Sequence, residues 1–433
     1  IYNEEEDGNS YYNFAYIDRL IDFFIDLGLK PYINIGFTPK KLKSAEQYVL
    51  STNVSYPKSI LKWNDLIKNL FIHFKEKYGS QVFEWKFEIW NNSDAYKTFW
   101  YESDEKFFEF FKETYNSIKL ASLNYKVGGP AIIVSEDTSY VEKFYEYTQQ
   151  NQIDLSFMSF HFYNVNRKSS ISINKNKWDF QFYEYDIYRN MIKNYVFKVK
   201  NIINKKMEII ISEWNSSPYY LDLTHDTCYM NTFIVDAIIN NINQVDAISY
   251  WTLIESRLGS GLFHGGFGLF TINNLKKSSY NTFLLLNKLG NKMISKGDNH
   301  IITSSENGYQ ILLYNHSYYN EEYRKGNFDI ISLKERYNAF EDKSKQEIII
   351  DLKNIESGDY LLKKYYLNKM DGSVYDSWVQ MGAPNNITKE IFSYLKSKEK
   401  MKLEISDVKI QEKLFLRETL GVHEIVFFEY IKN

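Results

Sequence analysis

Helix-like and strand-like stretches alternate over the first two thirds of the chain. Apolar residues between Ile17 and Phe24 recur at helical spacing, and Gly28 follows them as a C-terminal cap. Residues 30–37 then form a short apolar run typical of a buried strand. A second helical stripe covers residues 63–78 and again precedes a glycine. The pattern therefore predicts helix and strand in turn.

This alternation continues to about residue 254. The predicted strands cover residues 30–37, 85–92, 125–133, 153–163, 207–215 and 246–254. Further predicted helices cover residues 107–123, 140–150, 183–204 and 228–241. Such regular alternation is typical of a parallel sheet with crossover helices.

Polar and aromatic residues gather at the C-terminal ends of the predicted strands. They are Asn34, Asn92, His161, Glu213 and Trp251. A (β/α)8 TIM-type barrel keeps its active site at this end. A doubly wound open sheet is the alternative, but no glycine-rich phosphate loop follows any strand. The barrel is favoured, with six of its eight strands accounted for.

The pattern changes after about Asn291. Short alternating runs separated by turn residues predict an antiparallel β-sandwich, and residues 318–345 are predicted to form a long polar loop. We therefore expect a barrel domain over residues 1–290 and a sandwich over 291–433.

Composition narrows the functional classes. The 433 residues are 44% apolar and 25% charged, with a net charge of −3, which fits a globular chain without a nucleic-acid footprint. No apolar run approaches the ~20 residues that cross a bilayer. Cys228 is the only cysteine, so an intrachain disulfide is excluded and a reducing compartment is favoured. Aromatic residues reach 18%, which fits a sugar-stacking cleft or simply the composition of the genome.

Two strand ends carry candidate chemistry. "ISEWNSSP" places Glu213 at a strand terminus, and "WKFEIWNNSD" places Asn91 and Asn92 at another. Period-two alternation puts Glu88, Trp90 and Asn92 on one face of their strand. Glu213 suits a carboxylate in an aromatic-walled pocket, or else one partner of a salt bridge at the barrel top.

Several motifs resemble those of family 39 glycoside hydrolases, the β-xylosidases and α-L-iduronidases, over nearly the whole chain. The motifs include "EWKFEIWNNSD", "VGGPA", "DLSFMSFHFY", "ISEWNSSP", "HDTCY", "AISYWT", "FHGGFGLF" and "YLNKMDGSVYDSWVQMGAP". The resemblance implies a (β/α)8 barrel followed by a β-sandwich. It assigns the six predicted strands to barrel strands three to eight, with strands one and two expected upstream.

The resemblance also implies a retaining mechanism with two carboxylates. The nucleophile position corresponds to Glu213. The acid/base position, the glutamate of the family's Trp-Asn-Glu-Pro, corresponds to Asn92. A carboxamide has no proton to give near neutral pH, so half of the pair is substituted. Glu88 lies too deep to replace it, and Asp94 is the nearest carboxylate that a loop rearrangement could bring in.

In family register, further residues are expected to contact sugar. They are Phe37, Asn91, His161, Tyr163, Trp251 and Glu255, each of which also has a purely structural interpretation. The acidic residues that follow "SYWT" in the xylosidases are reduced here to Glu255 within "LIESRLGSGLFHGG". No metal and no cofactor are predicted.

Three functions follow from these features. The first is a carbohydrate-binding or sensing domain, the C-terminal part of an AraC-type transcription regulator from a low-GC Gram-positive bacterium. The second is an active retaining β-xylosidase-like hydrolase that uses Glu213, and the third is a structural or dimerising module. The expected ligand is a xylose-like mono- or oligosaccharide and the expected compartment is the cytoplasm. DNA contact would come only from an upstream domain, no membrane contact is expected, and a homodimer is left open.

Overall fold

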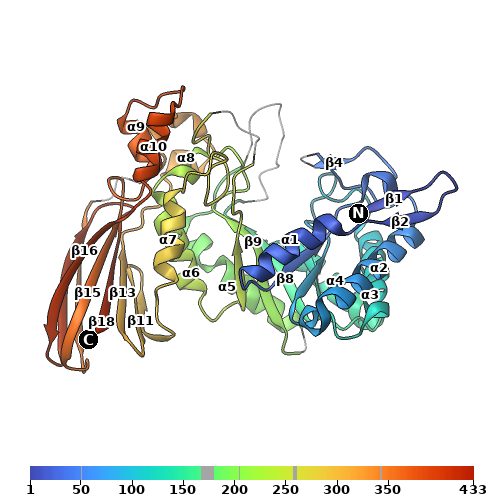
Figure 1. Cartoon of the computed structure of the whole chain (residues 1–433), viewed down its shortest axis with the longest axis horizontal. Coiled ribbons are helices and arrows are strands. Elements are labelled where there is room, and N and C mark those ends of the chain that lie inside the picture. Colours follow the sequence, from blue (N-terminus) through green and yellow to red (C-terminus); the bar gives the residue numbers. More distant parts are fainter. Residues whose placement is uncertain (50, 167–179, 204, 257–260, 342–343) are drawn as a thin grey trace. The chain divides into compact units, whose positions relative to one another are not determined.

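The chain forms two compact units in a computed structural model that describes all residues except 50, 167–179, 204, 257–260 and 342–343 (Figure 1). The first unit comprises Ile1–Phe162, Met191–Trp214 and Asn243–Ser249. The second comprises Tyr163–Asn190, Asn215–Ile242 and Tyr250–Asn433. Each unit is described by itself below. The domain boundary expected at residue 290 stays a prediction.

A six-stranded sheet in the order β10-β9-β8-β7-β6-β3 organises the first unit. Its strands are β3 (Tyr32–Ile35), β6 (Lys86–Ile89), β7 (Lys126–Ile133), β8 (Phe157–Tyr163), β9 (Glu208–Asn215) and β10 (Ala247–Tyr250). Neighbours from β3 to β8 pair in parallel. Gly128 on β7 leaves room for β8, because a Cβ there would lie 2.4 Å from the Phe157 carbonyl oxygen. All six predicted strands are present, in the order of a half-barrel.

Amphipathic helices cover this sheet. They are α1 (Ala15–Asp26), α2 (Ile60–Tyr78), α3 (Asp104–Ala121), α4 (Ser139–Gln150) and α5 (Tyr185–Ile202). The Ser59 side chain caps α2 by accepting from the Lys62 N–H, which satisfies one of the amides that a helix start leaves open. From α2, the buried Phe71 packs on Phe87 of β6 with ring centroids 4.6 Å apart. Short strand pairs β1 (Tyr2–Glu4) with β2 (Ser10–Tyr12) and β4 (Tyr48–Val49) with β5 (Thr52–Asn53) complete the unit.

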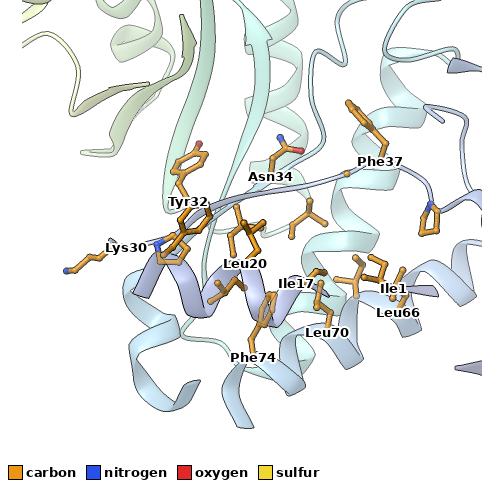
Figure 2. Close-up of a pocket in the computed structure, with 18 of the residues that line it drawn as sticks. Ile1, Ile17, Leu20, Lys30, Tyr32, Asn34, Phe37, Leu66, Leu70 and Phe74 are labelled. Carbon is orange, nitrogen blue, oxygen red and sulfur yellow. The ribbon is translucent and has the colours of Figure 1, made fainter. Parts of the chain in front are cut away.

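An apolar groove of about 540 Å³ lies beside β3, the last strand of the sheet. Figure 2 shows Leu20 of α1 and Phe74 of α2 on one side of β3, with Tyr32 and Asn34 pointing to the other side. Tyr32 and Asn34 share a side because residues two apart on a strand point to the same face. The expectation that further barrel strands pair with this edge stays a prediction.

An antiparallel β-sandwich dominates the second unit. Its larger sheet has the order β11-β12-β13-β18-β15-β16, and its smaller one pairs β14 with β17. The strands are β11 (Lys292–Gly297), β12 (His300–Ser305), β13 (Gly308–Tyr314), β14 (Gln346–Lys353), β15 (Gly358–Leu367), β16 (Lys402–Ile410), β17 (Lys413–Leu420) and β18 (Ile425–Lys432). The helices are α6 (Tyr229–Asn241), α7 (Ser278–Leu286), α8 (Glu321–Arg324), α9 (Val374–Gln380) and α10 (Lys389–Ser397). The predicted fold class, TIM-type barrel strands followed by a sandwich, is thereby confirmed.

The central strands of the larger sheet are buried on both faces, whereas its edge strands β11 and β16 are largely exposed. One face shares a core with β14 and β17, in which Ile311, Ile348 and Leu416 meet. The other face packs on α6 and α7 through Leu312 and Leu285. Period-two strands with apolar residues on both faces are what such a two-sided burial requires.

Several elements of the second unit were not expected from the sequence pattern. The strands β11 and β17 and the helices α7, α9 and α10 were not predicted. The predicted loop 318–345 contains the short helix α8 and two turns of 3₁₀-helix, while residues 342–343 lie outside the described part.

Candidate functional site

Asn92 stands at the tip of β6, where the backbone turns sharply. Trp90 and Asn92 have φ of 65° and 50°, a left-handed conformation that is uncommon for residues other than glycine. The Asn92 N–H donates to the Ala131 carbonyl oxygen at 2.8 Å. Ala131 is itself extruded where the register of β7 against β8 shifts between Pro130 and Ile132. The bulge in β7 therefore holds the Asn92 backbone in place.

Three side chains from three neighbouring strands converge beyond this tip. The His161 Nδ1 of β8 lies 2.8 Å from the Asn92 Oδ1 and 3.9 Å from the Glu213 Oε2 of β9. Asn92, His161 and Glu213 are only 4%, 1% and 7% exposed. An amide oxygen can only accept, so Nδ1 carries the proton in this arrangement. The amide NH₂ of Asn92 can then donate a hydrogen bond to a ligand oxygen but cannot transfer a proton.

Glu88 lies on β6, four residues before Asn92. Its carboxylate accepts hydrogen bonds from residues of two other strands of the sheet. Its Oε1 accepts from the Tyr32 hydroxyl at 2.9 Å and from the Ser212 hydroxyl at 2.6 Å, and its Oε2 accepts from the Asn34 amide at 3.0 Å. These donors come from β3 and β9. The sequence placed Glu88, Trp90 and Asn92 on one face, but β6 ends at Ile89 and the positive φ of Trp90 breaks that alternation.

Replacing Glu88 by leucine is expected to lower the free energy of unfolding by at least about 1–3 kcal/mol. The change leaves the hydroxyls of Tyr32 and Ser212 without their acceptor, and an unsatisfied buried donor costs about that much. Denaturant unfolding followed by circular dichroism measures the loss. Glu84→Leu is the control, because Glu84 is exposed and its ion pairs with Lys30 and Lys126 are 3.6 and 3.8 Å long. Equal losses for both variants would contradict this assignment.

Asp94 lies two residues after Asn92, close enough to the starts of α3 and α4 for its charge to act on Asp104 and Tyr140. Burial raises the pKa of Asp104 and of Tyr140, and the negative charge of Asp94 adds to both shifts. The preceding Ser93 hydroxyl lies 2.8 Å from the Tyr140 hydroxyl. Whether Asp94 replaces the missing acid stays a prediction.

Phe37 and Asn91 flank the same strand ends. Phe37 lines the groove beside β3 (Figure 2). Its ring meets the Trp90 ring edge-on, with centroids 5.0 Å apart. The buried Trp90 indole donates to the Phe99 carbonyl at 3.0 Å. Asn91 is half-buried beside Asn92. Their roles as sugar contacts stay predictions.

Three further sequence candidates belong to the second unit. Tyr163, at the end of β8, is 4% exposed, whereas Trp251, just after β10, is 42% exposed. The Asn215 amide donates to the Trp251 carbonyl oxygen. An exposed indole on a braced backbone is well suited to stacking on a sugar ring.

Glu255 is bound within its own unit. It is buried, its Oε1 accepts from the Ile272 N–H at 2.8 Å, and its Oε2 lies 3.0 Å from the Lys277 Nζ. Lys277 Nζ also lies 2.5 Å from Asp226 Oδ1, and Arg336 Nη1 lies 2.7 Å from Asp226 Oδ2. The expected sugar contact of Glu255 would have to compete with these interactions.

This buried cluster of Asp226, Glu255, Lys277 and Arg336 was not predicted. Burial raises the pKa of Asp226, but the charges of Lys277 and Arg336 outweigh it and lower the pKa to about 2. The two carboxylates and two cations balance in charge. Asp226 lies in the quoted motif "HDTCY", but no local signal ties it to a lysine and an arginine far along the chain.

The family of the chain follows from comparison with known proteins. The model of glycosyl hydrolases family 39 matches residues 1–412. The chain therefore belongs to glycosyl hydrolase family 39, which confirms the resemblance drawn from the motifs.

Similar proteins include two β-xylosidases. The chain is 30% identical over 325 residues to that of Geobacillus stearothermophilus, covering 71% of this chain and 63% of the relative. It is 32% identical over 303 residues to that of Caldicellulosiruptor saccharolyticus, covering 67% and 59%. The chain thus spans less than two thirds of the length of these relatives.

A relative of another kind is an HTH-type transcriptional regulator of Staphylococcus aureus. It is 24% identical over 278 residues, which are 62% of this chain and 35% of the regulator.

Solved structures agree with the fold. A monomeric β-xylosidase from Caulobacter crescentus CB15 matches with a TM-score of 0.85 at 22% identity, over 99% of this chain and 86% of that one. The family 39 enzyme from Xanthomonas axonopodis pv. citri matches with a TM-score of 0.86 at 19% identity, over 100% and 85%. At these identities the likeness shows the fold alone.

Two features are absent from the described residues. In that part of the chain, no helix is both long and apolar enough to cross a membrane. The same residues contain no group of three or more histidine, cysteine or acidic side chains arranged to hold a metal ion.

Proposed function

We propose that the chain is a glycosidase-like domain that binds a carbohydrate without hydrolysing it efficiently. The observation that carries this proposal is the trio of Asn92, His161 and Glu213. In it, the position that corresponds to the family's acid/base holds an amide, while the nucleophile position keeps its carboxylate. Polar groups that fix a sugar are retained, and the group that would protonate the leaving oxygen is absent from its place.

We propose further that the domain senses its sugar as part of a transcription regulator of the AraC type. The relative in Staphylococcus aureus supports this context, since the match covers only 35% of that regulator and leaves room for a DNA-binding segment elsewhere. A regulator acts where the DNA is, so the compartment would be the cytoplasm. The ligand is a xylose-like mono- or oligosaccharide, by analogy with the β-xylosidase relatives. A homodimer would suit such a regulator.

The alternative is a working retaining hydrolase of the β-xylosidase type with Glu213 as its nucleophile. The intact Glu213, 3.9 Å from His161, is the observation that favours it. Such an enzyme would need a proton donor other than Asn92.

Calorimetry and a hydrolysis assay, both with xylobiose, distinguish the non-hydrolytic binding domain from the working hydrolase. We expect xylobiose to bind the unchanged chain and to persist during long incubation, because its leaving sugar requires protonation. Sustained release of xylose would overturn the non-hydrolytic proposal in favour of the alternative. Absence of binding to xylose and xylobiose would leave a purely structural module. Glu213→Gln serves as the matched background for any trace of hydrolysis.

A further inference from the structure

Another pocket lies in the second unit, at the end of the sandwich where Figure 1 marks the C-terminus. It has a volume of about 320 Å³ and is lined by the turn from β12 to β13, the end of β14, the loop that follows β14, and the end of β18. Small-molecule sites usually have about 300–1,000 Å³. The pocket is therefore large enough for one small ligand.

The inner face of the larger sheet changes from apolar to polar at this pocket. Ile302 belongs to the core shared with β14 and β17, and Ser304, two residues further along β12, points to the same face. Lys292 and Tyr309 pair directly with Ser304 from the strands on either side, so the three side chains share that face. A lysine, a hydroxyl and a tyrosine ring thus line one wall of the pocket at the margin of the core.

Another wall is the loop that follows β14, and it is fixed at Glu356. The Glu356 N–H donates to the Tyr309 hydroxyl at 3.2 Å, and the Glu356 carbonyl oxygen accepts from the Tyr360 hydroxyl at 2.8 Å. The Glu356 carboxylate forms an ion pair with Lys432. The half-buried ring of Tyr309 is therefore held in place through its own hydroxyl.

Two charged side chains of the pocket have opposite hydrogen-bonding needs. The Lys292 ammonium can only donate, whereas the Glu306 carboxylate can only accept. Neither side chain makes an ion pair within the described part of the chain. A sugar hydroxyl suits both, because it carries one proton to donate and lone pairs that accept. The apolar C–H face of a sugar ring in turn suits the Tyr309 ring.

A simple anion is less suited to this pocket. Three lysines line it, but Lys432 is bound to Glu356 and Lys353 lies 4.0 Å from Asp351. The charge of Lys292 is therefore balanced in the pocket by that of Glu306. A ligand without net charge leaves this balance unchanged.

We propose that this pocket is a second carbohydrate site, which binds a neutral pyranose residue with its face against Tyr309 and its hydroxyls on Lys292 and Glu306. The pocket contains none of the residues of the trio at the strand tips. The inference therefore goes beyond the proposed function and does not depend on it.

The test follows the δ1 methyl signals of Ile294 and Ile355, which line the pocket, by NMR of the full chain. The neutral probes are methyl β-D-xylopyranoside and methyl β-D-glucopyranoside, and D-glucuronate is the charged probe. We expect saturable shifts of both signals with at least one neutral probe. The signals are specific to this pocket, so sugar bound at the trio is distinguished from sugar bound here.

Matched variants isolate the two contacts. Tyr309→Ala should weaken the binding by about tenfold through loss of the ring, while Tyr394→Ala, at an exposed ring of α10, should have no effect. Lys292→Met should weaken it by about tenfold or more through loss of a charged donor, while Lys409→Met, on the exposed edge strand β16, should not. Because Lys292 is exposed on β11, its variant keeps the test valid if Tyr309→Ala impairs folding.

Three results would overturn this inference. They are the absence of shifts with both neutral probes, shifts that persist unchanged in the Tyr309→Ala and Lys292→Met variants, and saturation by D-glucuronate at lower concentration than by either neutral probe. The last result would identify an anion site instead.

Discussion

Xylobiose hydrolysis is expected to rise by about 10²–10⁴-fold in an Asn92→Glu variant relative to the unchanged chain. The new carboxyl would stand at the tip of β6 beside His161, whose Nδ1 lies 3.9 Å from Glu213, with its backbone held by the Ala131 carbonyl. A carboxylic acid there can protonate the leaving sugar and then deprotonate water, and such assistance usually has this magnitude. Chromatographic detection of released xylose measures the effect.

Asn92→Gln is the matched control for this gain. It has the length of glutamate and lacks a titratable proton, so it should stay at the level of the unchanged chain. A similar gain from both substitutions would assign the effect to side-chain length and contradict the proton-donor interpretation. The gain should also vanish when Glu213→Gln is combined with Asn92→Glu, since the nucleophile is then lost.

Asp226→Ala is expected to destabilise the second unit by about 3–5 kcal/mol. The substitution leaves Lys277 and Arg336, both buried, with Glu255 as the remaining ion-pair partner among the described residues, and an uncompensated buried charge has about this cost. Thermal and denaturant unfolding measure the loss. Glu347→Ala is the control, because its pair with Arg417 is exposed and 3.6 Å long, and such pairs contribute about 0–1 kcal/mol.

Combining Asp226→Ala with Lys277→Met should cost less than the sum of the single changes, because Arg336 and Glu255 then balance each other. Additive losses would argue against a coupled cluster. The pKa of Asp226 is lowered to about 2 from 3.8, so its contribution is fully present above pH 3.8 and is lost as the pH falls towards 2. Asp226→Ala should therefore flatten the acid limb of the stability profile.

Periodicity predicted the six-stranded sheet of the first unit and its helices well because each of these elements has a clear pattern of its own, whereas the short pairs β1–β2 and β4–β5 were missed. The stripe that ends at Gly28 and the run before Asn92 are long enough to distinguish helix from strand. The sequence missed α9 and α10, which are short and lie in polar stretches, so their burial depends on tertiary partners such as Phe263. Short elements of this kind carry too few residues for a periodic signal.

The sequence was sufficient to predict which residues form the site, but not which hydrogen bonds they make. The motifs identified Asn92, His161 and Glu213. The hydrogen bond between Asn92 and His161, however, depends on the bulge at Ala131, and no local sequence pattern predicts that bulge. Glu255 illustrates the opposite case. Its place after "SYWT" was clear from the sequence, while its pairing with Lys277 arises from packing within the second unit.

The core that the larger sandwich sheet shares with α6 and α7 limits where the chain can be divided into separate folding units. Val235 and Ile239 of α6 and Leu285 of α7 precede residue 290, yet they are buried against Leu312, Leu367 and Phe427 of the sandwich. A gene fusion that exchanged only residues 291–433 would expose both halves of that core. The sandwich can therefore be inherited or transplanted only together with the helices α6 and α7, which makes recombination at this point a poor route to new specificity.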